Sequence, residues 1–266
     1  MIREGEKKMK ALVTGATSGI GQSIAKKLHK MGCELILTGR NKKMLMSMKK
    51  EFGEGTEIIS ADLSLKEDVY RVYKFCQGKN VDMLVNNAGF GVFGKFDETD
   101  LDIELELINL NITALHILTK LFLKDFKKQD RGIILNVASI AGFMTGPLLS
   151  SYYASKNYVL RLSMAIYEEL RRDRSNVSIT VLCPGPVDTN FNNRAGVSFG
   201  MKSITADRAA DCALRSAFSR KLFAIPSFSV KTAIFGARFV PYKLLAAISY
   251  NVQRRKSDED NKAVKR

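Results

Sequence analysis

KALVTGATSGIG, residues 10–21, is the stretch from which the architecture of this chain is best deduced. Its first five residues form a short apolar strand, and a glycine-rich turn leads from there into a periodic helix at 22–31. Such a turn aims backbone N–H groups and the positive end of the helix dipole at one point, which suits a pyrophosphate. Gly15 permits the tight turn, Gly19 lets a phosphate approach the backbone, and Gly21 allows close packing of helix on strand. The spacing G-x-x-x-G-x-G differs from G-x-G-x-x-G, and a plain glycine-rich turn is the alternative.

The rest of the chain continues the alternation of strands and helices. After the strand at 10–14, strands are predicted at 35–38, 57–61, 81–85, 132–138, 177–183 and 222–225. Helices are predicted after Asn41 and at 101–126, 151–172 and 205–219. This alternation predicts an α/β, Rossmann-like, doubly wound parallel sheet of about seven strands with helices on both faces. Ligands of such folds bind at the carboxyl ends of the strands.

Composition and charge limit the remaining possibilities. The chain has 266 residues, of which 45% are hydrophobic and 26% charged, which suits one domain over 1–227 with a C-terminal extension over 228–266. The net charge is +15, but the basic residues are scattered without a nucleic-acid-binding motif, so no nucleic-acid partner is expected. Four dispersed cysteines suit a reducing cytoplasm. His29 and His116 stand alone, so neither a metal site nor a Ser-His-Asp triad is expected.

Two positions after strands bear on the nucleotide. Arg40 follows the second strand, where an acid favours a free ribose 2′-hydroxyl and an arginine favours a 2′-phosphate. The sequence therefore predicts NADPH rather than NADH, although an arginine that solvates a helix start is the alternative. Asp62, with Leu63, follows the third strand. Its carboxylate is expected to accept a hydrogen bond from an adenine amino group, to cap the next helix, or both.

SYYASK, residues 151–156, places Tyr152 and Lys156 one helical turn apart on one face. A phenol has a pKa of about 10 in isolation. A neighbouring ammonium favours the phenolate and lowers that pKa toward the range that acid–base catalysis needs. A solvated helix face is the alternative, and Tyr153 is a competitor without a lysine four positions on.

These motifs, taken in order, resemble those of the classical short-chain dehydrogenase/reductase family. The resemblance covers about residues 10–225 and rests on T-G-x-x-x-G-x-G at 14–21, N-N-A-G at 86–89, Asn111, Ser139, Tyr152-x-x-x-Lys156 and Pro184-Gly185. It implies that Ser139 holds a substrate carbonyl, that Tyr152 protonates its oxygen, and that Lys156 lowers the tyrosine's pKa and holds the nicotinamide ribose. It further implies that Asn111 anchors a water that relays protons to Lys156. The residues then expected to bind NADP(H) are Gly15, Thr17, Ser18, Gly19, Ile20, Gly21, Arg40, Asp62, Leu63, Asn87, Ala88, Gly89, Tyr152, Lys156, Pro184, Gly185, Val187 and Thr189.

Two segments point to an apolar ligand and to further contacts. Residues 190–204 are small and polar enough for a mobile substrate lid, and they carry Phe191, Val197, Phe199 and Met201. Apolar residues near the other crevice walls could equally belong to the core, namely Phe90, Val92, Phe93, Phe143 and Met144. The extension is expected either to form two helices over the crevice or a subunit interface, or to contact an anionic membrane through 228–256. Residues 254–266 are expected to be disordered.

The sequence thus predicts an NADPH-dependent oxidoreductase that interconverts an apolar, hydroxysteroid-like or lipid-like ketone and its secondary alcohol. A 3-oxoacyl-[acyl-carrier-protein] reductase is the first alternative, and a catalytically silent NADP-sensing protein is the second. The family resemblance implies a homodimer or homotetramer. The expected location is the cytoplasm, with peripheral membrane contact as a further option.

Overall fold

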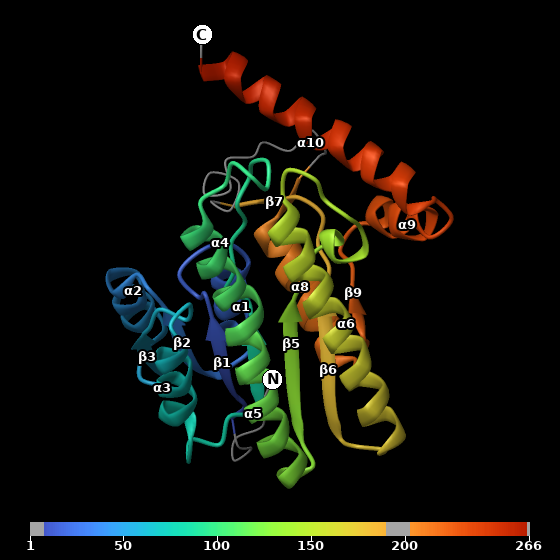
Figure 1. Ribbon diagram of the computed structural model, residues 1–266. Coiled ribbons are helices and arrows are strands. Elements are labelled where there is room, and N and C mark those ends of the chain that lie inside the picture. Colours follow the sequence, from blue (N-terminus) through green and yellow to red (C-terminus); the bar gives the residue numbers. More distant parts are fainter. Residues whose placement is uncertain (1–7, 190–202, 265–266) are drawn as a thin grey trace.

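A seven-stranded parallel sheet forms the centre of the molecule, in the order β3-β2-β1-β4-β5-β6-β9 (Figure 1). The computed structural model describes residues 8–189 and 203–264, with side chains up to Arg254. The strands are β1 (Lys10–Thr14), β2 (Glu34–Gly39), β3 (Thr56–Ser60), β4 (Met83–Asn86), β5 (Gly132–Val137), β6 (Val177–Leu182) and β9 (Phe223–Ala224). The predicted doubly wound sheet is confirmed, with strand boundaries that differ by one or two residues from those expected.

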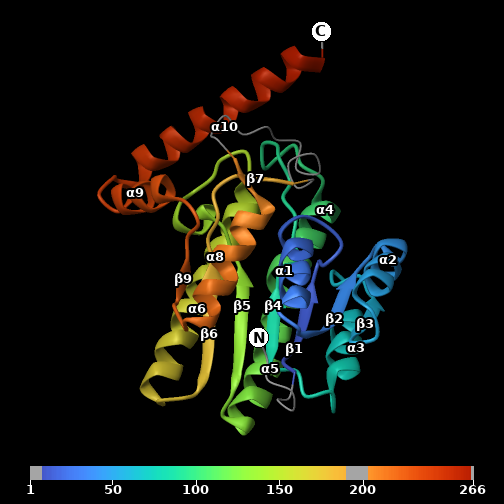
Figure 2. The same ribbon diagram turned by 180° about the vertical axis from the view of Figure 1, so that it is seen from behind.

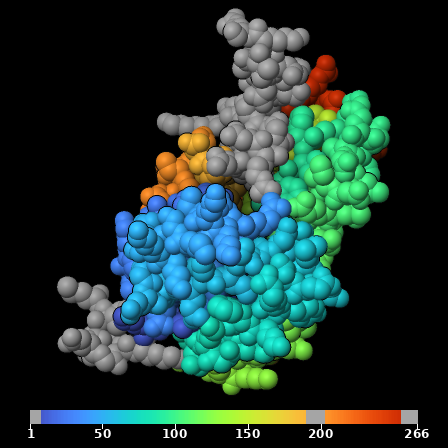
Figure 3. All heavy atoms as spheres, turned by 90° about the vertical axis from the view of Figure 1, so that its left-hand side faces the viewer, coloured from blue at the N-terminus to red at the C-terminus, as the bar shows by residue number. Residues whose placement is uncertain are grey.

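Helices cover both faces of this sheet because alternate strand residues point to opposite sides. Ala11 and Val13 of β1 join one buried cluster, and Leu12 between them joins the other. The first cluster packs on α1 (Gly19–Lys30), α2 (Lys42–Phe52) and α8 (Ala206–Phe218). The second packs on α3 (Lys66–Cys76), α5 (Leu115–Gln129) and α6 (Ser150–Arg172). Figure 3 shows the side of the molecule that α2 and α3 cover, in blue to cyan.

The predicted single helix over 101–126 is longer and is interrupted in its middle. It consists of α4 (Leu101–Ile108), a π-helical turn η1 (Asn109–Ala114) and α5. By length and composition alone, Leu101–Gln129 is the one helix in the described chain that could cross a membrane. Its Leu107, Leu118 and Phe126 side chains, however, are buried in the second core cluster. A core helix that packs against a sheet therefore accounts for this composition.

Three short elements complete the carboxyl edge of the sheet. A 3₁₀ turn, η2 (Ile140–Phe143), follows β5, and Ser139 caps it by accepting a hydrogen bond from the Ala141 N–H at 3.2 Å. A small two-stranded parallel sheet pairs β7 (Val187–Asp188) with β8 (Ile204–Thr205). Since η2 and β7 follow strands that end at the edge where α1 begins, this edge gathers the turns that can form a site.

The C-terminal extension forms two helices over the carboxyl edge of the sheet, α9 (Phe228–Ala237) and α10 (Tyr242–Val264) (Figures 1 and 2). Val230 and Ile234 of α9 and Leu245 of α10 are buried. The expectation of disorder over 254–266 is wrong up to Val264. Pro241 precedes the helix, and the sequence contains no Gly or Pro after it that would end the helix early.

Candidate active site

A cavity of about 720 Å³ lies at the carboxyl ends of the strands, below α9 and α10. Of the residues predicted to bind the cofactor, all but Gly21 line it. Ser139, Tyr152 and Lys156 also line it, whereas Asn111 lies behind its wall. The structure therefore brings together residues that the sequence spreads from Gly15 to Thr189.

The glycine turn at the start of α1 forms one end of this cavity. Gly15 and Gly19 have φ values of +61° and +53°, a left-handed conformation that favours glycine. A Cβ atom on Gly21 would lie 2.3 Å from Asn87 Nδ2 and 2.4 Å from the Gly15 carbonyl oxygen. The first turn of α1 contains no acidic residue. A helix N-terminus that begins with glycines and has no acidic side chain in its first turn fits the pyrophosphate of a dinucleotide.

Thr14 holds this turn to the neighbouring strand end, a role that the sequence analysis did not assign. Its Oγ1 accepts hydrogen bonds from the backbone N–H groups of Asn87 at 2.9 Å and Ala88 at 3.1 Å. The same hydroxyl donates to the Val85 carbonyl at 3.2 Å. Asn87 Nδ2 in turn donates to the carbonyls of Thr14 and Gly15 at 3.0 and 3.2 Å. The ends of β1 and β4 are thus fixed side by side.

Arg40 lies at the predicted ribose position, but it has two acidic neighbours. Its Nη1 donates to Glu106 Oε1 at 2.9 Å and lies 3.6 Å from Asp62 Oδ2. Glu106 comes from α4, 66 positions away, and no local sequence signal connects it with Arg40. A 2′-phosphate at this position would have to share the guanidinium with these carboxylates.

Asp62 does not cap α3, contrary to one of the two expectations, because the N-cap residue is Leu65 and Asp62 instead closes the turn that precedes the helix. Its Oδ1 accepts hydrogen bonds from the Ser64 N–H at 3.0 Å and the Ser64 hydroxyl at 2.7 Å. Burial raises the pKa of Asp62, but these hydrogen bonds and the charge of Arg40 outweigh burial and hold that pKa below its ordinary value. Asp62 is therefore an anion at neutral pH, and it still lines the cavity.

Tyr152 is paired with Ser139, and its phenol is protonated at neutral pH. Burial raises the pKa of Tyr152 above its ordinary value, and the hydrogen bond with Ser139 only partly offsets this effect. The residue as a whole is half-buried, but protein atoms surround the phenol closely enough for desolvation to dominate. A phenol in this state suits the donation of a proton to a carbonyl oxygen.

Lys156 lies near Tyr152 and is held in place by the backbone. Its Nζ donates to the Val137 carbonyl at 2.9 Å and lies 5.8 Å from the centre of the Tyr152 ring. Burial lowers the pKa of Lys156 to about 8, so the ammonium remains mostly charged at pH 7 and loses its charge as the pH rises above about 8. Lys156 is not among the groups that shift the pKa of Tyr152 in the protein alone, so the expected lowering of that pKa by Lys156 stays a prediction.

Asn111 sits in the π-helical turn η1 and clamps the loop after β4. Its Nδ2 donates to the Phe90 carbonyl at 2.9 Å and to Ser155 Oγ at 3.0 Å, while its Oδ1 accepts from the Phe90 N–H at 3.1 Å. A Cβ atom on Gly89 would lie 2.8 Å from Asn111 Oδ1 and 3.5 Å from Lys156 Nζ. Asn111 and Lys156 therefore both approach Gly89. π-Helical turns occur frequently at functional sites.

A network of buried side-chain hydrogen bonds lies beneath the site, and the sequence did not predict it. Asn86 Nδ2 donates to Thr119 Oγ1 and to Asn136 Oδ1, each at 3.0 Å. Asn136 Nδ2 donates to Ser163 Oγ at 3.0 Å. These bonds join β4, β5, α5 and α6 just below Asn87 and Ser139. The sequence shows only isolated polar residues in apolar strands, which do not reveal that they are partners.

The apolar part of the cavity differs from the predicted one. Phe90 and Met144 line it, but Phe93 packs on Leu149 and Phe143 packs on Phe223 instead. Val92 joins the second core cluster. The extension contributes much of the wall, through Ala233, Leu245, Ile248, Ser249, Val252 and Gln253.

Gln253 connects α10 directly to the helix that bears the tyrosines. Its Nε2 donates to the Tyr153 hydroxyl at 2.6 Å. The predicted crevice-covering role of the extension is therefore confirmed. The predicted lid over 190–204, with Phe191, Val197, Phe199 and Met201, lies outside the described residues except for Ser203 and Ile204. Ile204 pairs with Val187 next to the cavity.

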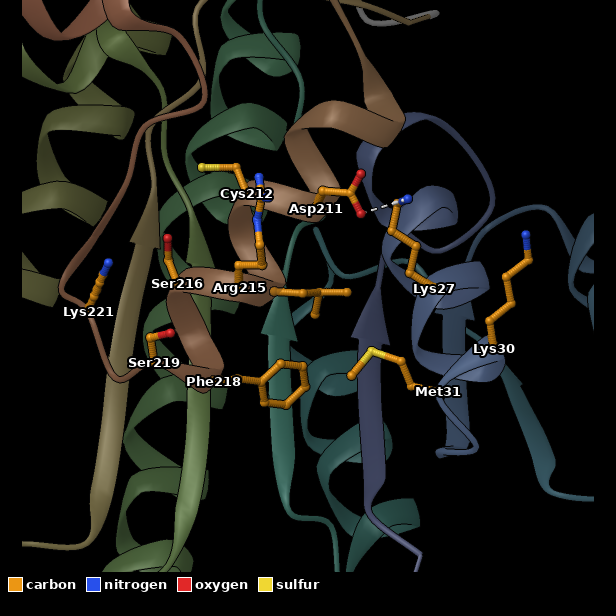
Figure 4. A pocket seen from close by; sticks show the side chains of 11 residues that line it. Lys27, Lys30, Met31, Asp211, Cys212, Arg215, Ser216, Phe218, Ser219 and Lys221 are labelled. Carbon is orange, nitrogen blue, oxygen red and sulfur yellow. Dashed lines mark ion pairs between the residues drawn. The ribbon is translucent and has the colours of Figure 1, made fainter. Parts of the chain in front are cut away.

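A second hollow lies between α1 and α8 and is lined by residues of both helices (Figure 4). Lys27 and Asp211 form an ion pair at 2.8 Å on its edge. It includes the C-terminal turn of α1, whereas the cavity with Tyr152 includes the N-terminal turn of the same helix. The chemistry predicted from the sequence therefore lies at the other end of α1. The described residues contain no group of three or more His, Cys, Asp or Glu side chains placed to hold a metal ion.

Comparison with known proteins places this chain in one family. The model of the short chain dehydrogenase family matches residues 9–197. The very-long-chain 3-oxoacyl-CoA reductase of Anas platyrhynchos is 36% identical over 198 residues, which cover 71% of this chain and 63% of that protein.

Two solved structures have a similar fold. A short-chain dehydrogenase from Sphingobium yanoikuyae in complex with NADPH has a TM-score of 0.78 and 30% identity, covering 86% of this chain and 93% of that one. The bulky-bulky ketone specific alcohol dehydrogenase from Comamonas testosteroni has a TM-score of 0.75 and 25% identity, covering 88% and 93%. The class is thus that of Rossmann-like oxidoreductases. Within it, the chain belongs to the short-chain dehydrogenase family.

Proposed function

We propose that this protein is an NADPH-dependent reductase of an apolar ketone or, in the reverse direction, an NADP+-dependent dehydrogenase of the corresponding secondary alcohol. The observation that carries this proposal is the cavity itself. It joins a helix N-terminus and an arginine at one end to Ser139, Tyr152 and Lys156 beside an apolar wall. The neighbour from Sphingobium yanoikuyae binds NADPH, and the enzyme from Comamonas testosteroni acts on bulky ketones, which supports the same assignment.

The residues of the chain fit a nicotinamide dinucleotide, with the glycine turn at its pyrophosphate and Arg40 at its adenosine ribose. When bound, the cofactor supplies a hydride. Ser139 and the protonated phenol of Tyr152 are the two hydroxyls that hold the carbonyl oxygen, and Tyr152 donates its proton to that oxygen. Lys156, which donates to the Val137 carbonyl and approaches Gly89 as Asn111 does, returns a proton toward Tyr152.

A 3-oxoacyl thioester is the second candidate substrate. The relative from Anas platyrhynchos is a 3-oxoacyl-CoA reductase, and an apolar wall built by α10 suits an acyl chain as well as a fused ring system. The two substrates differ in their polar ends, since a thioester carries a charged carrier group outside the cavity.

Oxidation of NADPH and of NADH, followed by absorbance, across bulky ketones, 3-oxoacyl thioesters and small diketones tests this proposal. Turnover with bulky ketones under NADPH is expected. A preference for 3-oxoacyl thioesters favours the second candidate. Tight NADPH binding with no turnover on any of these compounds would instead support the sensor interpretation.

The oligomeric state is proposed from one exposed surface. Leu101, Leu105 and Ile108 on α4 are 69%, 46% and 37% exposed, which is a large apolar area for a single helix. We assign this surface to the homodimer that the family resemblance implies. Light scattering of the eluted protein is expected to give twice the chain mass, and Leu105→Glu is expected to give the monomer.

A further inference from the structure

The two C-terminal helices have a buried face and an exposed face. Val230 and Ile234 of α9 and Leu245, Ser249 and Gln253 of α10 are buried. Their spacing of four residues places them on one side of each helix. The buried side packs on the cavity and on η2.

The other side is apolar and open to solvent. Its large side chains are Phe228 at 80% exposure, Phe235 at 62%, Phe239 at 74%, Tyr242 at 84% and Leu244 at 53%. Phe235 and Phe239 pack edge to face with ring centres 5.3 Å apart. An exposed group of aromatic residues on two adjacent helices and the turn between them is unusual on a water-facing surface and marks an interaction site. In Figures 1 and 2 both helices lie at the edge of the molecule, beyond the ends of the strands.

The charge of the same segment distinguishes between possible occupants. Lys231, Arg238 and Lys243 are exposed and lie between or next to the aromatic residues in the sequence, and Arg254 is exposed further along α10. From residue 228 to residue 256 the sequence contains six Lys or Arg residues and no Asp or Glu. A second copy of this chain would bring the same positive charges against these, and like charges across an interface are unfavourable. An anionic lipid surface instead attracts them, while aromatic side chains favour the boundary between headgroups and acyl chains.

We propose that α9 and α10 dock the protein on the surface of an anionic bilayer. The exposed Phe235, Phe239 and Tyr242 enter the interface, and Lys231, Arg238 and Lys243 contact the anionic headgroups. Ile248 and Val252, which are 47% and 46% exposed, also line the cavity, so the docking surface borders the cavity edge. Docking does not depend on the reaction proposed above.

Sedimentation with vesicles tests this proposal on the full chain. The protein is expected to pellet with vesicles of equal parts phosphatidylcholine and phosphatidylglycerol, and to stay in solution with phosphatidylcholine alone. The triple change Lys231→Glu, Arg238→Glu and Lys243→Glu is expected to weaken this binding by about a hundredfold. The matched control of Lys49→Glu, Lys50→Glu and Lys128→Glu has the same net charge but alters exposed residues elsewhere, so it is expected to bind within about threefold of the wild type.

A fluorescence measurement gives a second, independent readout. The native chain has no tryptophan, so Phe239→Trp places a single reporter on the docking surface. Its emission is expected to shift to shorter wavelength with the anionic vesicles, whereas a Leu65→Trp control on an exposed position away from these helices is expected not to shift.

Two results would overturn the proposal. One is equal weakening of vesicle binding by both triple variants, which would indicate charge attraction without a specific docking face. The other is that the wild type does not bind the anionic vesicles and the Phe239→Trp variant shows no emission shift. In that case light scattering of the double variant Phe235→Ser with Phe239→Ser is also measured, and a mass smaller than that of the wild type is looked for. That result would assign the face to a contact between subunits.

Discussion

Replacement of Glu106 by Gln is predicted to tighten NADPH binding and leave NADH binding unchanged. Glu106 accepts a hydrogen bond from Arg40 at 2.9 Å, and the two side chains are 35% and 42% exposed. A pair with this exposure is worth about 0.2–1 kcal/mol. Without the Glu106 charge, Arg40 no longer divides its interaction between a carboxylate and a 2′-phosphate, so the dissociation constant for NADPH should fall by about 1.4- to fivefold.

The increase in nicotinamide fluorescence on binding measures both dissociation constants without turnover. Arg40→Ala is expected to weaken NADPH binding by at least about tenfold, because a charge-assisted hydrogen bond to phosphate contributes about 1.5–3 kcal/mol. Glu98→Gln, which breaks an exposed pair with Lys95, is the control and should change neither constant. Weaker NADPH binding in Glu106→Gln, or an equal gain for NADH, would refute the role given to Arg40.

Two further predictions concern the tyrosine site and the glycine turn. Ketone reduction is expected to slow as the pH rises through about 8, because burial sets the pKa of Lys156 at about 8 and its positive charge is lost above that pH. A kcat that stays constant from about pH 7 to 10 would contradict this. Gly21→Ala is expected to destabilise the fold by about 1–3 kcal/mol in urea unfolding, because its Cβ would lie 2.3 Å from Asn87 Nδ2. Gly236→Ala in α9 is the control, because a Cβ atom added there would have no neighbour within 4 Å. Equal stability of the two variants would argue against close packing at Gly21.

The sequence predicts the sheet and the shared position of its turns because these depend on local signals. Apolar strand runs, the glycine turn and the helix periods each lie within a dozen residues, and the parallel arrangement then brings Gly15, Ser139 and Tyr152 to one edge. Arg40 and Asp62 each follow a strand of the same parallel sheet, so their positions at the cavity were predictable in the same way.

The interactions that tune the site depend on long-range contacts and were not predictable. Glu106 reaches Arg40 across 66 positions, and Gln253 reaches Tyr153 across 100. The raised pKa of Tyr152 depends on how densely the fold surrounds the phenol, which the spacing to Lys156 does not encode. The π-helical turn at Asn111 is likewise a product of packing, since its sequence continues an ordinary helical pattern.

Single-turnover reduction by the Tyr152→Phe variant tests the central claim most directly. The enzyme is loaded with NADPH and mixed with the best ketone of the panel, and NADPH binding is measured in parallel by fluorescence. Tyr153→Phe is the matched variant, since it removes the neighbouring hydroxyl that Gln253 contacts. Tyr152 as proton donor predicts unchanged NADPH binding and a rate about 10²–10⁴-fold lower for Tyr152→Phe, with a far smaller loss for Tyr153→Phe. A Tyr152→Phe enzyme that reduces the ketone at the wild-type rate would contradict it.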